Sequence, residues 1–173
     1  HIVLPGVGSY ESCVEGLKNS NLLDILSKKV LEAHLPFLGI CVGMQMLSSQ
    51  GFENGIFKGL NWIKGDVKKI KKSDKNLKIP HMGWNSIDIA HPSPMLNDIT
   101  QEAYVYFVHS YYVEPLEKKI ICTETTYGNT FVSSVAYENI FACQFHPEKS
   151  GKSGAKLLAN WLDWLKKETL ILY

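Results

Sequence analysis

The chain has 173 residues, of which 45% are hydrophobic, and a formal net charge of +1. This length fits one domain with a sizeable core, and the small net charge gives no global field that would attract nucleic acid or a membrane. All 18 basic residues are lysines, which disfavours a phosphate site built on bidentate arginine. The four cysteines, at positions 13, 41, 122 and 143, form no CxxC pair or metal-ligand spacing.

The chain starts at His1, without a methionine, and enters an apolar segment at once. We expect residues 1–173 to form a single domain whose N-terminal part is truncated or absent. No apolar run approaches the roughly 18 residues of a transmembrane helix, and no signal peptide is visible. Together with the cysteine pattern, this predicts a cytoplasmic protein with reduced thiols and no membrane partner.

The first half of the chain alternates strand and helix patterns. Residues 1–4 predict a short buried strand, and residues 5–9 form a turn signal. Helical spacing of apolar residues covers residues 10–33, where residues 19–21 interrupt it, and residues 37–40 predict a second strand. This order predicts an α/β fold with a parallel sheet and helices on its faces.

The segment from Phe37 to Leu47 has the pattern of a nucleophile elbow. A short apolar strand meets Gly39-Ile40-Cys41-Val42-Gly43, and a helical pattern follows. The glycines suit a strained turn and leave room for a substrate. Cys41 would lie at a helix N-terminus, where the dipole and free N–H groups favour the thiolate. The alternative interpretation is a buried cysteine in a core strand.

The second half of the chain reads mainly as strands. Residues 65–70 predict an exposed strand, residues 71–78 a polar loop or hairpin, and residues 104–113 an aromatic run typical of core strands. Further strands are expected at 119–125, 131–137 and 140–145, with a turn at 127–129. Residues 153–167 predict an amphipathic helix. Its apolar face would carry Ala155, Leu158, Leu162 and Leu165.

Two surface features have competing interpretations. Residues 58–78 contain eight lysines and two aspartates, which indicates a solvated face or a docking surface for an acidic partner; nucleic acid is disfavoured without interleaved aromatic residues. The segment Pro80-His81-Met82-Gly83-Trp84-Asn85 contains residues that anchor interfaces when they are exposed. The alternative is that Trp84 packs inward.

The predicted strand at 140–145 ends in His146-Pro147-Glu148. Strand ends are where α/β enzymes carry functional side chains, and residues two apart in an extended segment face the same way. Cys41, His146 and Glu148 therefore supply a nucleophile, a base and a carboxylate that orients the base. His109 is a rival base because it also follows an apolar strand, but no carboxylate lies two residues after it.

These motifs resemble the class I (triad-type) glutamine amidotransferases, on the segments Gly39–Gln45 and Phe145–Glu148. Further segments narrow the resemblance to the glutaminase subunits of histidine biosynthesis: Pro5–Ser9, Pro80–Asn85, Tyr106–Tyr111 and His146–Ser150. The resemblance implies a flavodoxin-like fold, with a central, mostly parallel sheet flanked by helices. It also implies that the family's first strands are missing from this chain.

The resemblance further implies which residues act. Cys41 would attack glutamine and form a thioester, with His146 as proton carrier and Glu148 as its orienting partner. The oxyanion would be held by the loop Gly6-Val7-Gly8, which is thought to flip, and by the backbone of Val42. Gln45 would contact the substrate, flanked by Ser110 and Tyr111. The resemblance implies no cofactor and no metal.

The family passes ammonia to a barrel-shaped cyclase subunit, with which it forms a heterodimer and which makes imidazole glycerol phosphate and AICAR. By resemblance, Met82, Trp84 and Lys149 lie at that interface. A paralogous subunit that supplies ammonia for amidination in surface-sugar synthesis keeps nearly all of these motifs, so it stays open as an alternative. A cysteine peptidase and a non-catalytic binding module are further alternatives. Gln45 and the Gly6–Gly8 loop argue against the peptidase, and the intact Cys41, His146 and Glu148 set argues against the binding module.

Overall fold

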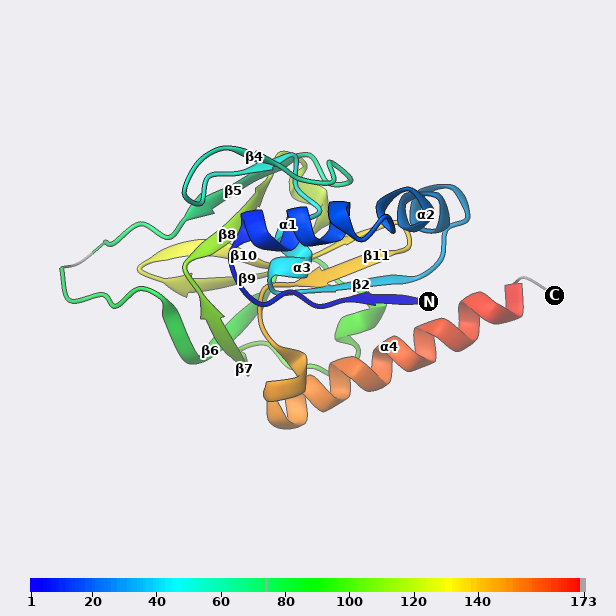
Figure 1. The fold of residues 1–173 in the computed structure, drawn as a ribbon. Helices are drawn as coiled ribbons and strands as arrows, with labels where there is room; N and C mark the ends of the chain where they lie inside the picture. Colours follow the sequence, from blue (N-terminus) through cyan, green and yellow to red (C-terminus); the bar gives the residue numbers. More distant parts are fainter. Residues whose placement is uncertain (74, 172–173) are drawn as a thin grey trace.

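The computed structural model describes residues 1–73 and 75–171, with side chains for residues 1–73 and 75–166. Its central feature is a seven-stranded sheet (Figure 1). In spatial order the strands are β1 (Ile2–Leu4), β2 (Phe37–Ile40), β11 (Ile140–Cys143), β10 (Asn129–Tyr137), β9 (Ile121–Tyr127), β6 (His81–Ile89) and β7 (Ala103–His109). A four-stranded sheet of β4 (Phe57–Lys58), β3 (Gln50–Gly51), β5 (Gly65–Lys69) and β8 (Tyr111–Pro115) lies beside it.

The central sheet is mixed rather than mostly parallel. Only β1, β2 and β11 run parallel, and the pairs from β11 through to β7 are antiparallel. The physical reason is connection length: Gly128 alone separates β9 from β10, and residues 138–139 separate β10 from β11. Connections this short can join only antiparallel neighbours. The expectation of a parallel sheet therefore holds for the three strands on one side.

Helices cover both faces of this sheet. The helix α1 (Tyr10–Asn19) and the short α2 (Leu23–Ser27) lie on one face, and α4 (Gly151–Ile171) lies on the other (Figure 1). Ser9 caps α1 by accepting a hydrogen bond from the Ser12 N–H. The predicted interruption at residues 19–21 is real, since Asn21 has a φ of 59°. A π-helical turn at Lys28–Glu32, the short α3 (Val42–Gln45), and 3-10 turns at Pro94–Leu96, Lys118–Ile120 and Pro147–Lys149 complete the helical segments.

The core divides into two clusters, one on each face of the sheet. Phe37 packs with Val14 of α1, whereas its neighbour Leu38 packs with Leu157 and Trp161 of α4. Neighbouring residues of a strand point to opposite faces, so the continuous apolar run of β2 supplies both clusters. This double burial is typical of a parallel strand covered by helices.

The buried face of α4 differs from the one expected. Leu157 and Trp161 are buried, whereas Ala155 and Leu162 are exposed. The expected face is half right: Leu158 and Leu165 pack against the core cluster, but Ala155 and Leu162 do not. Trp161 belongs to that cluster as well, and a Cβ at Gly154 would lie only 1.9 Å from the carbonyl oxygen of Pro147, in the 3-10 turn before α4.

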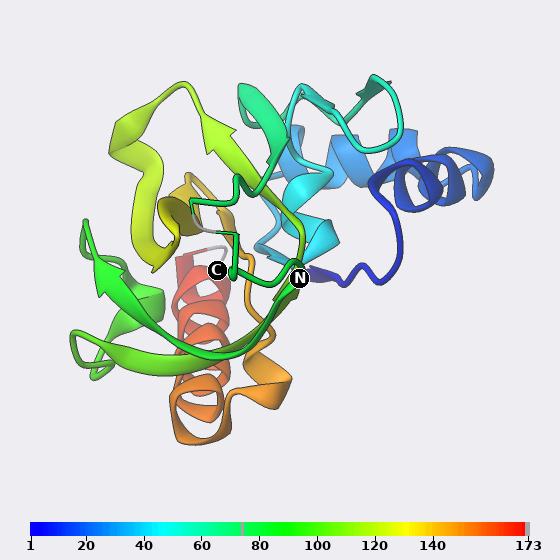
Figure 2. The ribbon, with the colours of Figure 1, turned by 90° about the vertical axis from the view of Figure 1, so that its left-hand side faces the viewer.

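The aromatic run at 104–113 forms two strands in different sheets. It divides at Ser110, so that β7 pairs with β6 and β8 pairs with β5. The strand β6 was not expected from its sequence; with β7 it curves across the face of the molecule shown in Figure 2. The polar segment 71–78, described except for residue 74, extends away from both sheets (Figure 1). The strand at 65–69 is half-buried rather than exposed, because Val67 reaches the core.

We predict that Gly43→Ala destabilises the fold. A Cβ at Gly43 would lie 1.9 Å from the Leu4 carbonyl oxygen, so α3 and β1 must separate; overpacking of this kind costs about 1–3 kcal/mol. Urea unfolding measures the free energy. The matched control is Gly16→Ala in α1, where a Cβ meets nothing within 4 Å and where alanine should add about 0.5–1 kcal/mol. Equal stability of the two variants would contradict the close approach.

Candidate active site

Cys41 sits on a strained elbow between β2 and α3. Its φ of 55° and ψ of −113° lie outside the regions that side chains other than glycine favour. Three backbone hydrogen bonds hold this conformation. The Cys41 N–H donates to the Cys143 carbonyl at 2.8 Å, and the Cys41 carbonyl accepts from Met44 and Gln45 at 3.0 and 3.2 Å. A strained backbone conformation costs free energy, so its presence at a single residue indicates a functional position.

The Cys41 thiol is buried and protonated in this state. Burial raises the pKa of Cys41 to about 11; the Val42 N–H and the Gln144 side chain lower the pKa, and the charge of Glu148 raises it. The expectation that the helix terminus favours the thiolate is right in direction, since the Val42 N–H lowers the pKa of Cys41, but burial outweighs it. The single turn of α3 gives only a small dipole.

His146 reaches the same edge of the sheet as Cys41 because β2 and β11 are parallel neighbours. Ile40 pairs with Cys143 in register, and the two candidate residues follow these strand ends. His146 Nδ1 lies 2.7 Å from Glu148 Oε1, and because a carboxylate oxygen accepts, Nδ1 carries a proton. His146 Nε2 is buried and has no hydrogen-bond partner among the described residues.

A pocket of about 190 Å³ opens over Cys41. It is lined by Gly8, Cys41, Val42, Gln45, Glu53, Pro80, Val108, His109, Ser110 and Tyr111. The sequence had indicated six of these: Gly8, Cys41, Val42, Gln45, Ser110 and Tyr111. A larger, apolar cavity of about 400 Å³ lies elsewhere, beside Trp62, Leu116 and Tyr137, and contains none of the predicted site residues. The smaller pocket therefore holds the predicted nucleophile, but neither His146 nor Glu148 is among the described residues that line it.

The loop Gly6-Val7-Gly8 packs directly against the elbow. A Cβ at Gly6 would lie 2.7 Å from the Gly43 nitrogen and 2.8 Å from the Val42 Cβ, so only glycine allows this approach. The Val7 side chain is exposed, and its carbonyl accepts a weak hydrogen bond from the Cys13 thiol at 3.6 Å. The predicted oxyanion elements, this loop and Val42, are thus adjacent in space.

His109, the rival base, has both nitrogens engaged. Its Nδ1 lies 2.8 Å from the Tyr111 carbonyl oxygen, and its Nε2 lies 3.0 Å from His81 Nδ1. Burial lowers the pKa of His81 to about 4 and that of His109 to about 3. His109 therefore belongs to the wall of the pocket rather than to its acid–base chemistry.

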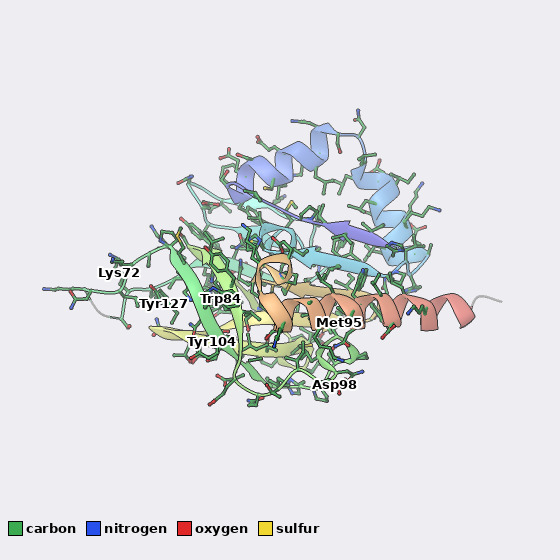
Figure 3. All side chains as sticks on the ribbon, turned by 90° about the horizontal axis from the view of Figure 1, so that it is seen from below. Lys72, Trp84, Met95, Asp98, Tyr104 and Tyr127 are labelled. Carbon is green, nitrogen blue, oxygen red and sulfur yellow. The ribbon has the colours of Figure 1, made fainter. Side chains whose placement is uncertain are left out.

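Two of the predicted interface residues, Met82 and Trp84, lie on the outer face of the β6–β7 pair, and the third, Lys149, ends the 3-10 turn Pro147–Lys149. Met82 and Trp84 are 62% and 54% exposed, and Tyr104 is 60% exposed; Trp84 and Tyr104 lie together near the start of α4 (Figure 3). This settles the alternative that Trp84 packs inward. The Lys149 ammonium lies 6.0 Å from the centre of the Tyr106 ring.

That face is bonded to the segment that carries His146. The His146 N–H donates to the Tyr106 carbonyl at 2.9 Å, and the Tyr106 N–H donates to Ser150 Oγ at 2.9 Å. The exposed aromatic face and the candidate base therefore share backbone contacts.

Sequence reasoning missed Glu53 and Gln144. Glu53 brings a carboxylate to the pocket and accepts from the Tyr10 N–H at 2.6 Å. Gln144 Nε2 lies 3.6 Å from the Cys41 sulfur. A polar residue inside the apolar run before His146 was the available signal for Gln144. Glu53 lies in an irregular segment and offered none.

The described part of the chain contains neither a membrane-spanning helix nor a metal-binding cluster. Within residues 1–73 and 75–171, no helix combines the length and hydropathy needed to cross a membrane. In the same part of the chain, no three His, Cys, Asp or Glu residues are grouped so as to hold a metal ion.

We predict that acid weakens the fold through His81 and His109. Both pKa values are lowered from 6.5 on folding, so the unfolded chain binds more protons below pH 6.5. Stability is full above about pH 7 and falls from pH 6.5 down to the folded pKa values, about 4 for His81 and about 3 for His109, with a loss of about 2 kcal/mol per ring at pH 5. Urea unfolding at pH 7 and 5 measures this. His81→Asn combined with His109→Asn should reduce the loss, whereas the exposed control His34→Gln should keep it; equal losses in both would contradict the assignment.

Comparison with known proteins agrees with this geometry. Residues 1–164 match the family model described as "Glutamine amidotransferase class-I". The "Imidazole glycerol phosphate synthase subunit HisH" of Caulobacter vibrioides is 42% identical over 94% of this chain and 76% of that protein. The protein of the same name from Pelagibacter ubique is 45% identical over 94% of this chain and 78% of that protein.

A solved structure described as a glutamine amidotransferase has the same fold. It superposes with a TM-score of 0.68 over 95% of this chain and 78% of that one, at 15% identity. The expected fold family is thereby confirmed, with the mixed sheet described above. With the family model matching nearly the whole chain and relatives above 40% identity, the chain belongs to the class I glutamine amidotransferase family.

Proposed function

We propose that this chain hydrolyses glutamine at Cys41 and passes the ammonia to a cyclase subunit that makes imidazole glycerol phosphate and AICAR. The observation that carries the proposal is that a strained Cys41 and His146, whose Nδ1 lies 2.7 Å from Glu148 Oε1, follow the adjacent ends of the parallel strands β2 and β11, with a pocket over Cys41. Family membership and the HisH relatives support the choice of glutamine as substrate.

The proposed reaction uses the three side chains in turn. The Cys41 sulfur attacks the side-chain amide carbon of glutamine as its proton passes to His146 Nε2. The C–N bond of the tetrahedral intermediate then breaks, and His146 returns the proton to the departing nitrogen, which releases ammonia and leaves a γ-glutamyl thioester. Water, deprotonated by His146, hydrolyses the thioester to glutamate and restores the thiol.

The raised pKa of Cys41 explains why the base is needed. At a pKa of about 11, little thiolate exists at neutral pH, so the proton must leave during attack. The unpartnered Nε2 of His146 supports that role, and the 2.7 Å contact with Glu148 would stabilise the imidazolium that forms.

The oxyanion has two candidate sets of donors. The Val42 N–H already points at the Cys41 sulfur, and Gly6-Val7-Gly8 lies against it. Preorganised backbone N–H groups of this kind are each worth about 100- to 1000-fold in rate. The loop would complete the site by turning a peptide N–H toward the substrate.

The pocket has matching groups for the amino-acid end of glutamine. Glu53 offers a carboxylate to the α-ammonium group, and Ser110 and Tyr111 line the same pocket. The Gln45 amide nitrogen is engaged by the Tyr111 carbonyl and by Gln144, both at 2.9 Å. Its oxygen is then the group that can accept a hydrogen bond from the substrate.

The partner would dock on the exposed face of β6 and β7. Met82, Trp84 and Tyr104 supply the apolar area, and Lys149 stands at its edge, which suits the aromatic core of an interface. A barrel-shaped cyclase in a heterodimer would receive ammonia there, with Lys149 near the channel mouth. Transfer through a closed channel keeps ammonia unprotonated and therefore nucleophilic.

This proposal places the chain in the cytoplasm and calls for no cofactor or metal. Amidination in surface-sugar synthesis, the alternative with the same chemistry, is not favoured, because the relatives at 42–45% identity are named as HisH subunits.

Replacing Cys41 tests the chemistry. Cys41→Ala should abolish glutamine hydrolysis, measured as glutamate formed in the presence of the cyclase subunit, because alanine cannot form the thioester. Cys122→Ala is the matched control: this buried thiol belongs to the opposite core cluster, and its loss should leave hydrolysis intact. Hydrolysis by the Cys41→Ala variant would overturn the proposal.

Replacing Trp84 tests the docking face. Trp84→Ala should weaken binding of the cyclase subunit by about 2 kcal/mol or more, as expected for a central aromatic anchor, measured by calorimetric titration. Leu116→Ala, an equally apolar and more exposed site outside β6 and β7, is the control and should bind normally. The complex also tests the pathway. If it hydrolyses glutamine but the ammonia does not reach the cyclase substrate, the histidine-pathway assignment is excluded.

A further inference from the structure

A buried histidine pair lies beside the candidate site without a role in its proton transfers. His81 on β6 and His109 on β7 face each other across the strand pair, on the inner side of the sheet. Both are buried, at 3% and 6% exposure. Such a pair is costly unless every nitrogen has a partner of the right kind.

The direction of the hydrogen bonds through this pair is determined from both ends. Asn85 Nδ2 is a donor, so His81 Nε2, 3.3 Å away, accepts, and the proton of the neutral His81 ring lies on Nδ1. At the other end, the Tyr111 carbonyl can only accept, so His109 Nδ1 carries a proton and its Nε2 accepts. The two assignments meet at His81 Nδ1–H donating to His109 Nε2 at 3.0 Å.

The chain of contacts continues to the nucleophile. The Tyr111 carbonyl also accepts from Gln45 Nε2 at 2.9 Å, and the second hydrogen of that nitrogen goes to Gln144 Oε1 at 2.9 Å. This orients the Gln144 amide so that its nitrogen faces the Cys41 sulfur at 3.6 Å. A donor aimed at the sulfur favours the thiolate.

We propose that His81 and His109 are positioning residues for Cys41. By fixing the Tyr111 carbonyl, they orient Gln45 and Gln144, and so hold the donor that stabilises the Cys41 thiolate. The inference rests on Cys41 being the nucleophile of the proposed function.

The position of Tyr111 makes such a clamp necessary. β7 ends at His109 in one sheet, and β8 begins at Tyr111 in the other, so the pocket wall lies where the chain changes sheets. The bond from the His109 ring to the carbonyl two residues later closes this turn. Without it, β8 would stay paired with β5 through Tyr111 and Lys69, but the Tyr111 carbonyl would keep only one of these two side-chain hydrogen bonds, that from Gln45. Networks of buried polar groups lose order when one member is missing.

A purely structural role makes a different prediction. The His81 ring stacks on Tyr127 at 4.0 Å and on Phe107 at 4.7 Å, so it also packs as an aromatic side chain. If packing is its whole role, phenylalanine should replace it well and asparagine badly. If the hydrogen bond matters, asparagine should replace histidine better than phenylalanine does, because asparagine carries a nitrogen at the same distance from its Cβ as His Nδ1.

The test compares His109→Phe with His109→Asn, and His81→Phe with His81→Asn. The readout is the rate at which iodoacetamide alkylates Cys41 as a function of pH, followed by mass spectrometry of the Cys41 peptide. It needs neither glutamine nor a partner, so it stands even if the proposed function fails. The other groups acting on Cys41, namely the charge of Glu148 and the thiols of Cys13 and Cys143, stay unchanged.

We expect the phenylalanine variants to alkylate about three- to tenfold more slowly below the pKa of the thiol, as its pKa rises by about half to one unit. In the complex, kcat for glutamine should fall about 10- to 100-fold. The asparagine variants should stay within about threefold of the unmodified chain. His91→Phe is the control, because His91 bonds to the Ile121 carbonyl, outside this network, and should change nothing.

Folded phenylalanine variants that alkylate at the unmodified rate would overturn the inference. Asparagine variants as impaired as phenylalanine variants would overturn it too, because a hydrogen-bonding nitrogen at the Nδ1 position would then make no difference. If His109→Phe does not fold, His109→Gln replaces it. Glutamine keeps a polar partner for His81 but cannot hold the Tyr111 carbonyl from the Nδ1 position, so it should show the same slow alkylation.

Discussion

Parallel pairing of β2 with β11 brings Cys41 and His146 to one edge of the sheet, although 105 positions separate Cys41 from His146 along the chain. Ile40 lies opposite Cys143, and the Cys41 N–H donates to the Cys143 carbonyl. The elbow conformation, the depth of the sulfur and the approach of Gln144 all depend on this register. A shift by one residue would turn the side chains of β11 to the opposite face.

The site combines two demands that oppose each other. The proposed thioester formation and ammonia transfer would favour a dry environment, but a dry environment raises the pKa of Cys41 to about 11. Two donors oppose this rise in pKa, the Val42 N–H and the Gln144 amide. The unpartnered nitrogen of His146 is the proposed acceptor of the thiol proton. Glycines at positions 6 and 43 let the backbone itself come close enough to take part.

Alternate residues of β6 and β7 face opposite sides of the sheet, and the two sides have different proposed roles. Residues on its outer face, among them Met82 and Trp84, are exposed and apolar, while His81 and His109 on its inner face reach toward the pocket. One pair of strands therefore borders both the proposed partner and the proposed nucleophile. The backbone bond between His146 and Tyr106 ties the same pair to the candidate base.

Much of the site could be predicted from local sequence, because a nucleophile elbow and a His-Pro-Glu segment are short patterns with local causes. Cys41, His146 and Glu148, the glycine loop and the alternation of strand and helix up to residue 45 were all readable in this way. The class I family was readable too, since several motifs occur in the expected order. Hairpins such as β9–β10 followed from a single turn residue, Gly128.

Tertiary structure alone decided the rest. The protonated state of Cys41 depends on burial by segments distant in sequence, and the buried face of α4 depends on how Trp161 fits the sheet. Glu53, Gln144 and the His81–His109 pair gain their significance from neighbours 12 to 103 positions away. Local propensity carries no information about such contacts, because they form only when separate strands take one register in the folded sheet.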